Sequence, residues 1–380
     1  MNSRLSVKVV GMGAAGLRLL GKLAAVGFPG SHFIALDSDI EELQKCQLAD
    51  RIQIGKMTRR GWGCRGDAAQ GAECVRASID RIAKKIQGAD MVLLLAGAGG
   101  GIGGGGAAPV AEIAKEQGTL VITIVIQSFD LEMCQDSSNL AIERLSQVSD
   151  ALICIPNQAV LDSMPKDCSL QECLELSNVR ILESLMGFGR LLRIDGIVNI
   201  ELEDLRGLIM GKHYSGFMVS FEMTGDFNAK VIVDSLMKHP FYDHRLDSSR
   251  CTGVVVAMTG GNILDLNQLK EIEESLESNF PRAEKVVGLY HDRSMNSAIG
   301  VTLIVFGSST VVMNLENNQI SLEKNRLVGN PDKITTLGAR GVQQQLPLVP
   351  VSKGCFDKGE SNLHDGEDLD VPTFLRRNII

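Results

Sequence analysis

Residues 96–118 read AGAGGGIGGGGAAPVAEIAKEQG, a glycine-rich loop between an apolar run and a helix-like segment. The apolar run is Met91–Leu95, and Pro109 stands near a first-turn position of the helix, which we expect to begin near Ala108. Glycines let the backbone approach a phosphate closely, and free N–H groups at a helix N-terminus meet its charge. We therefore predict a phosphate-binding loop here rather than a flexible low-complexity insertion.

A second glycine-rich loop lies near the N-terminus, where Gly11-Met12-Gly13-Ala14-Ala15-Gly16 follows a strand-like run and opens a helix-like one. Alone, this GxGxxG pattern is also the fingerprint of dinucleotide-binding proteins, and Asp37 stands near where a ribose-binding acid belongs. A nicotinamide-dependent oxidoreductase is therefore a competing interpretation. Two phosphate-binding loops on neighbouring strand ends can instead enclose a di- or triphosphate from two sides, and a dehydrogenase has no need of the second.

The chain around these loops alternates short apolar runs with segments of helical period, which predicts a parallel sheet with helices on both faces. The expected strands are Ser6–Val10, Phe33–Leu36, Met91–Leu95, Leu120–Ile126 and Ala151–Ile155. In such sheets ligands bind at the carboxyl ends of the strands. Both glycine loops follow expected strands, so we look for the chemistry there.

The second half of the chain begins with one long helix candidate, from about Ser169 to Arg193. A second α/β region follows, with expected strands Gly253–Met258 and Val301–Phe306, and then a stretch rich in Gly, Gln, Asn, Pro and Lys that predicts a flexible linker. The predicted divisions are a nucleotide-binding domain (1–168), a central helix (169–195), a second smaller α/β domain (196–316), a flexible linker (317–366) and a tail (367–380).

Composition excludes several classes of function. The 380 residues are 44% hydrophobic, enough for two cores, and a net charge of −8 argues against nucleic acid as a partner. The nine cysteines contain no CxxC pair and the six histidines no ligand-like spacing, so we expect no protein-built metal site and a reducing cytoplasm. No segment resembles a signal peptide or a membrane span, so we expect a cytosolic protein without direct membrane insertion.

Several segments, taken in order, resemble the tubulin/FtsZ family. Residues 96–118 are similar to its signature, in which a GGGTGTG loop is followed by AAPVVAE. The other matching segments are GADMVLLLAG, ALICIPN, GIVNIELEDL, GVVVAMTGGN and LDVPTFLRR. The resemblance covers almost the whole chain except the linker. It implies a tubulin/FtsZ-like fold, with a Rossmann-like nucleotide domain, a long central helix and a smaller activating domain.

The resemblance implies a GTPase that binds GTP or GDP with Mg²⁺. Carried over position by position, its nucleotide contacts fall on Gly11, Gly13, Ala14, Ala15, Gly16 and Arg18, on Gly99, Gly100, Gly101, Gly103, Gly104 and Gly105, and on Glu132 and Asn178. The loop from Gly61 to Gly71, which holds Trp62 and Asp67, corresponds to the stretch that senses the terminal phosphate.

The polar run Asn199-Ile200-Glu201-Leu202-Glu203-Asp204 matches the family's NxDxxD element, which reaches the nucleotide of a neighbouring subunit. The glycine loops supply donors but no group that orients water, and phosphoryl transfer needs one. The resemblance therefore assigns catalysis to Asn199, Glu201 and Asp204, acting in trans after head-to-tail self-assembly. The alternative is that these acids only stabilise the first turn of a helix through its dipole.

Some positions depart from the family pattern. Ile102 and Gly104 stand where the signature loop has threonines, so two hydroxyl groups are missing. Leu174 stands where an aromatic ring stacks on the base, and Val179 where an acid accepts the guanine N–H groups. A site that loses such an acceptor loses base discrimination. A filament subunit that does not hydrolyse GTP is therefore a second interpretation.

The C-terminal tail carries an exposed apolar pattern with no nearby core to join. The anchors are Val371, Pro372, Phe374 and Leu375, followed by Arg376. Such segments order on binding a partner groove. By resemblance, the tail docks onto membrane-tethering and regulatory division proteins, which implies a cytoplasmic protein at a mid-cell division ring.

Overall fold

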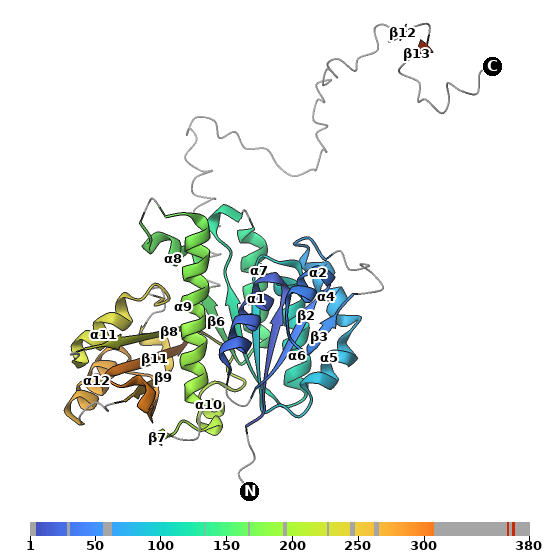
Figure 1. Cartoon of the computed structure of the whole chain (residues 1–380). Helices are drawn as coiled ribbons and strands as arrows, with labels where there is room; N and C mark the ends of the chain where they lie inside the picture. The colour runs from blue at the N-terminus through green and yellow to red at the C-terminus, as the bar shows by residue number, and fades with distance from the viewer. Residues whose placement is uncertain are drawn as a thin grey trace, which may run out of the picture. The chain divides into compact units, whose positions relative to one another are not determined.

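The computed structural model describes residues 5–28, 31–55, 63–132, 134–165, 168–192, 196–225, 228–243, 248–261 and 266–307, with 363–364 and 367–368 (Figure 1). The chain forms two units, Met1–Glu323 and Lys324–Ile380. The second unit contributes a two-stranded antiparallel pair, β12 (Leu363–His364) and β13 (Glu367–Asp368). The rest of the predicted linker and the tail residues Val371, Pro372, Phe374, Leu375 and Arg376 lie outside the described residues.

The strands described in the first unit join in one mixed sheet in the order β3-β2-β1-β4-β5-β6-β8-β11-β9-β10-β7. The strands are β1 (Val7–Met12), β2 (Ser31–Asp37), β3 (Asp50–Gln53), β4 (Met91–Gly97), β5 (Leu120–Ile126), β6 (Ala151–Ile155), β7 (Gly196–Val198), β8 (Tyr214–Thr224), β9 (Cys251–Gly260), β10 (Glu284–His291) and β11 (Ala298–Gly307). Pairing is parallel from β3 to β8, and β11 is antiparallel to both β8 and β9.

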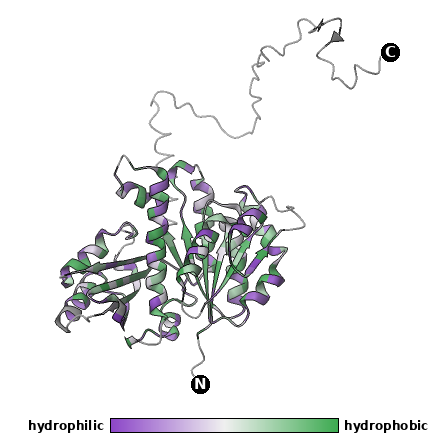
Figure 2. Ribbon diagram, in the orientation of Figure 1, coloured by the Kyte–Doolittle hydropathy of each residue, from purple (hydrophilic) through white to green (hydrophobic). Residues whose placement is uncertain are grey.

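Helices cover both faces of the parallel part, as the alternation along the chain predicted (Figure 1). Successive residues of β4 enter different cores, because Leu93 and Leu95 pack with α1 and α9 while Val92 and Leu94 pack with α4 to α7. The helices are α1 (Gly13–Val26), α2 (Ile40–Lys45), α4 (Ala68–Arg76), α5 (Ile79–Ile86), α6 (Gly106–Glu116), α7 (Gln135–Val148), α8 (Asn157–Ser163), α9 (Leu170–Leu191), α10 (Leu202–Ile209), α11 (Ala229–Lys238) and α12 (Leu266–Asn279). Figure 2 shows largely hydrophobic strands and helices in which hydrophobic and hydrophilic residues alternate.

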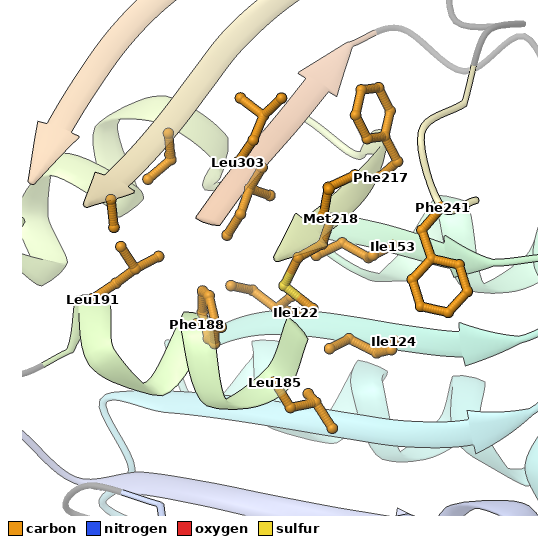
Figure 3. Close-up of a cluster of buried hydrophobic side chains, with 14 of the residues drawn as sticks. Ile122, Ile124, Ile153, Leu185, Phe188, Leu191, Phe217, Met218, Phe241 and Leu303 are labelled. Carbon is orange, nitrogen blue, oxygen red and sulfur yellow. The ribbon is translucent and has the colours of Figure 1, made fainter. Parts of the chain in front are cut away.

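The long predicted helix is α9, Leu170–Leu191. It begins with a capping box, in which the Ser169 hydroxyl accepts from the Glu172 N–H and the Glu172 carboxylate accepts from the Ser169 N–H. Its buried face carries Leu185 and Phe188 against β5, β6, β8 and β11 (Figure 3). One helix thus packs on both parts of the sheet. The domain boundaries given above stay a prediction.

All seven strands expected from apolar runs are present. The helix expected from about Ala108 starts earlier, because a π-helical turn, η1 (Gly101–Gly105), leads directly into α6 at Gly106. Glycines can pack closely enough to make this turn, so much of the expected loop is helical. Pro109 lies in the first turn of α6, inside the helical stretch that begins with η1.

Candidate nucleotide site

A cavity of about 390 Å³ opens at the carboxyl ends of four parallel strands. Met12, Asp37, Gly97 and Ile126 each end a strand, β1, β2, β4 and β5 respectively, and each lines this cavity. Parallel strands bring their carboxyl ends to one edge, so segments far apart in sequence meet there. The predicted site residues on the wall are Gly13, Ala14, Ala15, Arg18, Gly99, Gly100, Gly101, Gly103, Glu132 and Asn178.

The two glycine loops contact each other across the cavity floor. Gly13 has a positive φ of 69°, which favours glycine, and a Cβ built on it would lie 3.2 Å from the Gly103 nitrogen. Gly13 begins α1, and Gly103 lies in η1. Backbone N–H groups from two helical N-termini therefore converge on one cavity, an arrangement that suits an anion with several phosphate groups.

Four predicted glycines lie behind the cavity wall instead. A Cβ on Gly11 would be 2.7 Å from the Gly16 oxygen, and one on Gly16 would overlap the Leu95 oxygen. Likewise, Gly104 lies against the Ala98 oxygen and Gly105 against the Ala68 oxygen. Close approach between backbone segments therefore requires glycine at these four positions, and none of the four lines the cavity.

Gly100 has different surroundings. Its backbone is extended (φ −87°, ψ 153°), and a Cβ built on it would meet only the Gly97 oxygen, at 3.8 Å. Gly101 also lines the cavity, but a Cβ there would lie 2.7 Å from the Cβ of Cys64. A side chain at Gly101 would therefore displace the segment before α4, whereas backbone neighbours leave room for a side chain at Gly100.

The cavity wall carries charges of both signs. Arg18 and Arg65 are exposed cations, and Arg65 has a positive φ of 47° in the tight turn before α4. Asp37 is buried, and this burial raises its pKa to about 6 even though its Oδ1 accepts from the Asp39 N–H at 3.0 Å. Asp39 and Glu42 line the same side. Arg65 belongs to the loop from Gly61 to Gly71 that was predicted to sense the terminal phosphate, although it was not named individually. Sequence reasoning missed Asp39 and Glu42, although the two-residue spacing of Asp37 and Asp39 after a strand could have indicated an acidic edge.

At another part of the wall, α9 supplies Leu174, Ser177 and Asn178. The Ser177 hydroxyl donates to Asn157 Oδ1 at 2.6 Å, and both side chains are buried. Val179 is 46% exposed and is not part of the wall. Sequence reasoning missed Asn157 and Ser177, because their hydrogen bond joins α8 to α9 and leaves no local signal in the sequence.

The predicted catalytic residues do not lie at this cavity. Asn199 and Glu201 are exposed between β7 and α10, and Asp204 is exposed in the first turn of α10. Both elements lie beyond the C-terminal end of α9 (Figure 1), whereas the residues of α9 that line the cavity are Leu174, Ser177, Asn178 and Ile181. The 22 residues of α9 give it a length of about 33 Å. Within one chain, the structure therefore separates these carboxylates from the glycine loops.

The Asn199–Asp204 segment has a defined local geometry. The Asp204 carboxylate accepts from the Glu201 N–H at 2.8 Å, and the Glu201 side chain accepts from the Asp204 N–H, which forms a capping box for α10. Asn199 Oδ1 accepts from the Gly196 N–H at 2.8 Å. The Ile200 N–H donates to the Tyr290 hydroxyl, which in turn donates to the Leu191 carbonyl. The segment is thus tied to the end of α9.

Asp67 and Trp62 were predicted to belong to the loop that senses the terminal phosphate. Asp67 is the N-cap of α4, where its carboxylate accepts from the Gln70 N–H at 3.0 Å, and it is not on the cavity wall. Trp62 lies outside the described residues.

Among the residues that are described, no group of three or more acidic, His or Cys side chains could hold a metal ion. None of the described helices combines the length and apolar character needed to cross a bilayer.

Comparisons with known proteins identify similar chains. Residues 6–165 match the tubulin/FtsZ family, GTPase domain. Over 380 residues the chain is 27% identical to the cell division protein FtsZ of Buchnera aphidicola subsp. Acyrthosiphon pisum, covering 99% of this chain and 98% of that protein. FtsZ of Coxiella burnetii is 28% identical over 98% of this chain and 96% of that protein.

A solved structure has the same fold. The empty FtsZ dimer from M. jannaschii superposes with a TM-score of 0.74 at 27% identity, covering 81% of this chain and 89% of that one. The similarity extends well beyond residue 165 and includes the second part of the sheet.

Proposed function

The chain belongs to the tubulin/FtsZ family, with a GTPase domain over residues 6–165, and we propose that it binds GTP in the cavity at the carboxyl ends of β1, β2, β4 and β5. The observation that carries this proposal is the convergence of Gly13 and Gly103, because it directs backbone donors from two helix N-termini into one cavity. Arg18 and Arg65 add positive charge at the same wall. The proposed contacts on the wall are the ten predicted residues given above.

Mg²⁺ fits this site as a partner of the nucleotide. Mg²⁺ is usually held by one or two carboxylates, several waters and substrate phosphates rather than by an all-protein cage. Asp37, Asp39 and Glu42 offer carboxylates on the cavity wall, and no three-ligand cluster occurs among the described residues. When bound, Mg²⁺ would neutralise phosphate charge. The acids on this wall would otherwise oppose a triphosphate.

We further propose that the chain assembles head to tail and that Glu201 and Asp204 of one subunit complete the GTP site of the next. The C-terminal half of α9, about 15 Å from Ile181 on the cavity wall to Leu191, separates these acids from the cavity and supports this, because a chain cannot bring them to its own nucleotide. Repeated stacking of unlike ends produces a filament. The described M. jannaschii relative is a dimer, which is consistent with association between copies of such chains.

The test is sedimentation together with phosphate release after separate addition of GTP, ATP and NADH. We expect GTP with Mg²⁺ to pellet the protein and to release phosphate at a rate per subunit that rises with protein concentration. Turnover by monomers at a constant rate per subunit would contradict completion of the site in trans. Selective binding of NADH would favour the dinucleotide interpretation instead.

A structural filament that does not hydrolyse GTP is the second candidate. Two observations favour it: Ile102 and Gly104 leave the signature loop without hydroxyl groups, and Glu201 and Asp204 already cap α10. In this case GTP would drive sedimentation without phosphate release. The same experiment therefore separates the two candidates.

We propose that these filaments act in cell division, in the cytoplasm at the division site. Relatives named cell division protein FtsZ match nearly the whole length of the chain, which supports this role. The tail segment with Val371, Pro372, Phe374, Leu375 and Arg376 would connect the filament to tethering partners. A short apolar motif that orders on binding suits such a contact.

A further inference from the structure

Two cysteine thiols lie together beside the proposed nucleotide site. Sγ of Cys64 is 3.7 Å from Sγ of Cys74, and the side chains are 5% and 1% exposed respectively. Cys64 precedes α4 and lines the cavity, whereas Cys74 lies in α4 and packs in the core beneath the glycine loop. Ten residues of chain separate them, and the fold brings their sulfur atoms nearly into contact.

The surroundings of Cys64 connect this pair to the cavity wall. Its Cβ lies next to Gly101, and its carbonyl accepts from the Asp67 N–H at 2.9 Å, which closes a tight turn. Arg65 and Gly66 within this turn have positive φ angles of 47° and 82°. Because Arg65 also lines the cavity, a shift of the turn that begins at Cys64 would move a proposed phosphate contact.

We propose that Cys64 and Cys74 form an intramolecular disulfide under peroxide and that its formation competes with nucleotide binding. The competition with nucleotide binding rests on the proposed function. A disulfide requires the sulfur atoms to approach to about 2 Å, so both side chains must turn toward each other. Cys64 would then lose its 3.5 Å contact with the Ser38 hydroxyl, and the turn that holds Arg65 would shift.

The chemistry is balanced with peroxide as the oxidant. The Cys64 thiol loses its proton and its sulfur attacks one peroxide oxygen; the O–O bond breaks to give a sulfenic acid, and the departing hydroxide takes the released proton to become water. Sγ of Cys74 then attacks Sγ of Cys64, the S–O bond breaks, and the departing hydroxide takes the Cys74 proton as a second water. Two thiols lose two electrons, and one peroxide becomes two waters. Peroxide is small enough to reach Cys64 through the cavity that this residue lines, and a bound nucleotide would cover this route.

The first test treats nucleotide-free full-length protein with hydrogen peroxide, blocks remaining thiols and maps the peptides by mass spectrometry. We expect a linked Cys64–Cys74 peptide that reductant releases, while the buried Cys173 thiol in α9 stays reduced as an internal control. In Cys74→Ala, the link must disappear and a sulfenic acid at Cys64 should react with dimedone. Absence of the linked peptide, or linkage of Cys64 to Cys134 instead, would overturn the proposal.

The second test adds GTP and Mg²⁺ before the peroxide. We expect the linked peptide to form at least about fivefold more slowly, because Cys64 is covered. Oxidised protein should bind GTP at least about tenfold more weakly, with recovery after reduction, and Cys74→Ala should keep its affinity through the same treatment. Equal oxidation at saturating GTP, or the same loss of affinity in Cys74→Ala, would refute the competition. A protein that forms the disulfide but never binds GTP would refute the proposed function and leave the disulfide site standing.

Discussion

Gly100 is the position in its loop where a side chain can block the cavity without disturbing the fold. It is exposed, its φ and ψ suit any residue, and the nearest atom to a built Cβ is 3.8 Å away. We predict that Gly100→Phe weakens GTP binding by about a hundredfold or more, or about 3 kcal/mol, because the ring occupies phosphate space. Calorimetric titration with GTP would measure this loss.

The matched control for this variant is Gly21→Phe. Gly21 lies in α1, and nothing stands within 4 Å of a Cβ built there. Both variants should unfold within about 1 kcal/mol of the parent, since neither site forces a clash. Unchanged GTP affinity in Gly100→Phe, or equal loss in both variants, would remove the loop from the binding site.

The raised pKa of Asp37 leads to a second prediction at the residue scale, which concerns how the stability of the fold depends on pH. Burial raises its folded-state pKa to about 6, above the ordinary 3.8, so the folded protein holds this proton more tightly than the unfolded chain. Ionisation therefore costs folded-state stability as pH rises from about 4 to about 6, and the full cost remains above that window. In Asp37→Asn, which keeps an oxygen acceptor for the Asp39 N–H, this cost is absent.

The measurement is urea unfolding of both ligand-free proteins between pH 4 and pH 7. The free energy of unfolding of Asp37→Asn should match that of the parent near pH 4 and exceed it by about 3 kcal/mol at pH 7. All other groups titrate in both proteins, so the difference isolates Asp37. A difference that does not change with pH would show that its carboxyl group titrates normally in the fold.

At the scale of elements, the N-terminus of α10 has two possible roles that one pair of variants can separate. Asp204 accepts from the Glu201 N–H, so Asp204→Ala removes both a helix cap and a carboxylate. Asp204→Asn keeps an acceptor and removes only the charge. We predict that the Ala variant loses about 1 kcal/mol of stability and that the Asn variant stays near the parent.

Phosphate release should fall in both variants by about a hundredfold or more if the Asp204 carboxylate orients water. Binding of GTP to either variant should remain, since Asp204 does not line the cavity. Normal hydrolysis by Asp204→Asn together with a loss in Asp204→Ala would assign Asp204 to the helix cap alone. Steady-state phosphate release at equal degrees of sedimentation is the appropriate comparison.

Elements differ in how much of them the sequence could predict. β5 is an unbroken apolar run that is buried at every position, so its sequence alone identifies a central strand. β8 was missed, because Gly216, Ser215 and Ser220 interrupt its apolar pattern. The Ser220 hydroxyl pairs with that of Thr302 on β11 at 2.9 Å, which satisfies these two buried hydroxyl groups. Such a partner lies 82 residues away, and no local pattern indicates it.

The same limit applies to the candidate site. Glycine loops and strand ends predicted the cavity, because parallel strands bring their ends together wherever the sequence places them. Asn157 was missed, since its place depends on the hydrogen bond from Ser177, and Arg65 was predicted only as part of its loop, since its place on the wall depends on a turn. Gly11, Gly16, Gly104 and Gly105 share the sequence pattern of the wall glycines, yet they pack on backbone behind it. A motif cannot distinguish these two uses of glycine.

At the scale of the whole molecule, the tail can be tested apart from the folded unit. Residues 368–380 follow the predicted linker and lie beyond the large sheet in sequence. We predict that deleting them leaves GTP binding and sedimentation within about twofold of the parent, because no cavity residue is removed, and abolishes recruitment to the division site. Fluorescence microscopy of tagged protein would measure recruitment. Normal recruitment of the shortened chain, or failure to sediment, would contradict a separable tail.

Completion of the GTP site in trans can be tested in filaments that contain two different variants. If each active site combines the cavity of one subunit with the Asn199–Asp204 segment of the next, two inactive variants should complement each other. Gly100→Phe retains the acidic segment and loses the cavity, whereas Asp204→Asn retains the cavity and loses the carboxylate. In a mixed filament, the intact cavity of one variant faces the intact Asp204 of the other at some of the interfaces.

Each variant alone should release phosphate at no more than about 1% of the parent rate. An equimolar mixture should recover up to roughly a quarter of that rate, because random stacking places an intact cavity against an intact carboxylate at one interface in four. Recovery should rise with total protein concentration. It should vanish when one of the two proteins in the mixture carries both substitutions, Gly100→Phe and Asp204→Asn. A mixture no more active than the two proteins separately, although both sediment together, would show that one chain completes its own site. The separation of Asp204 from the cavity by the C-terminal half of α9 makes that outcome incompatible with the fold described above.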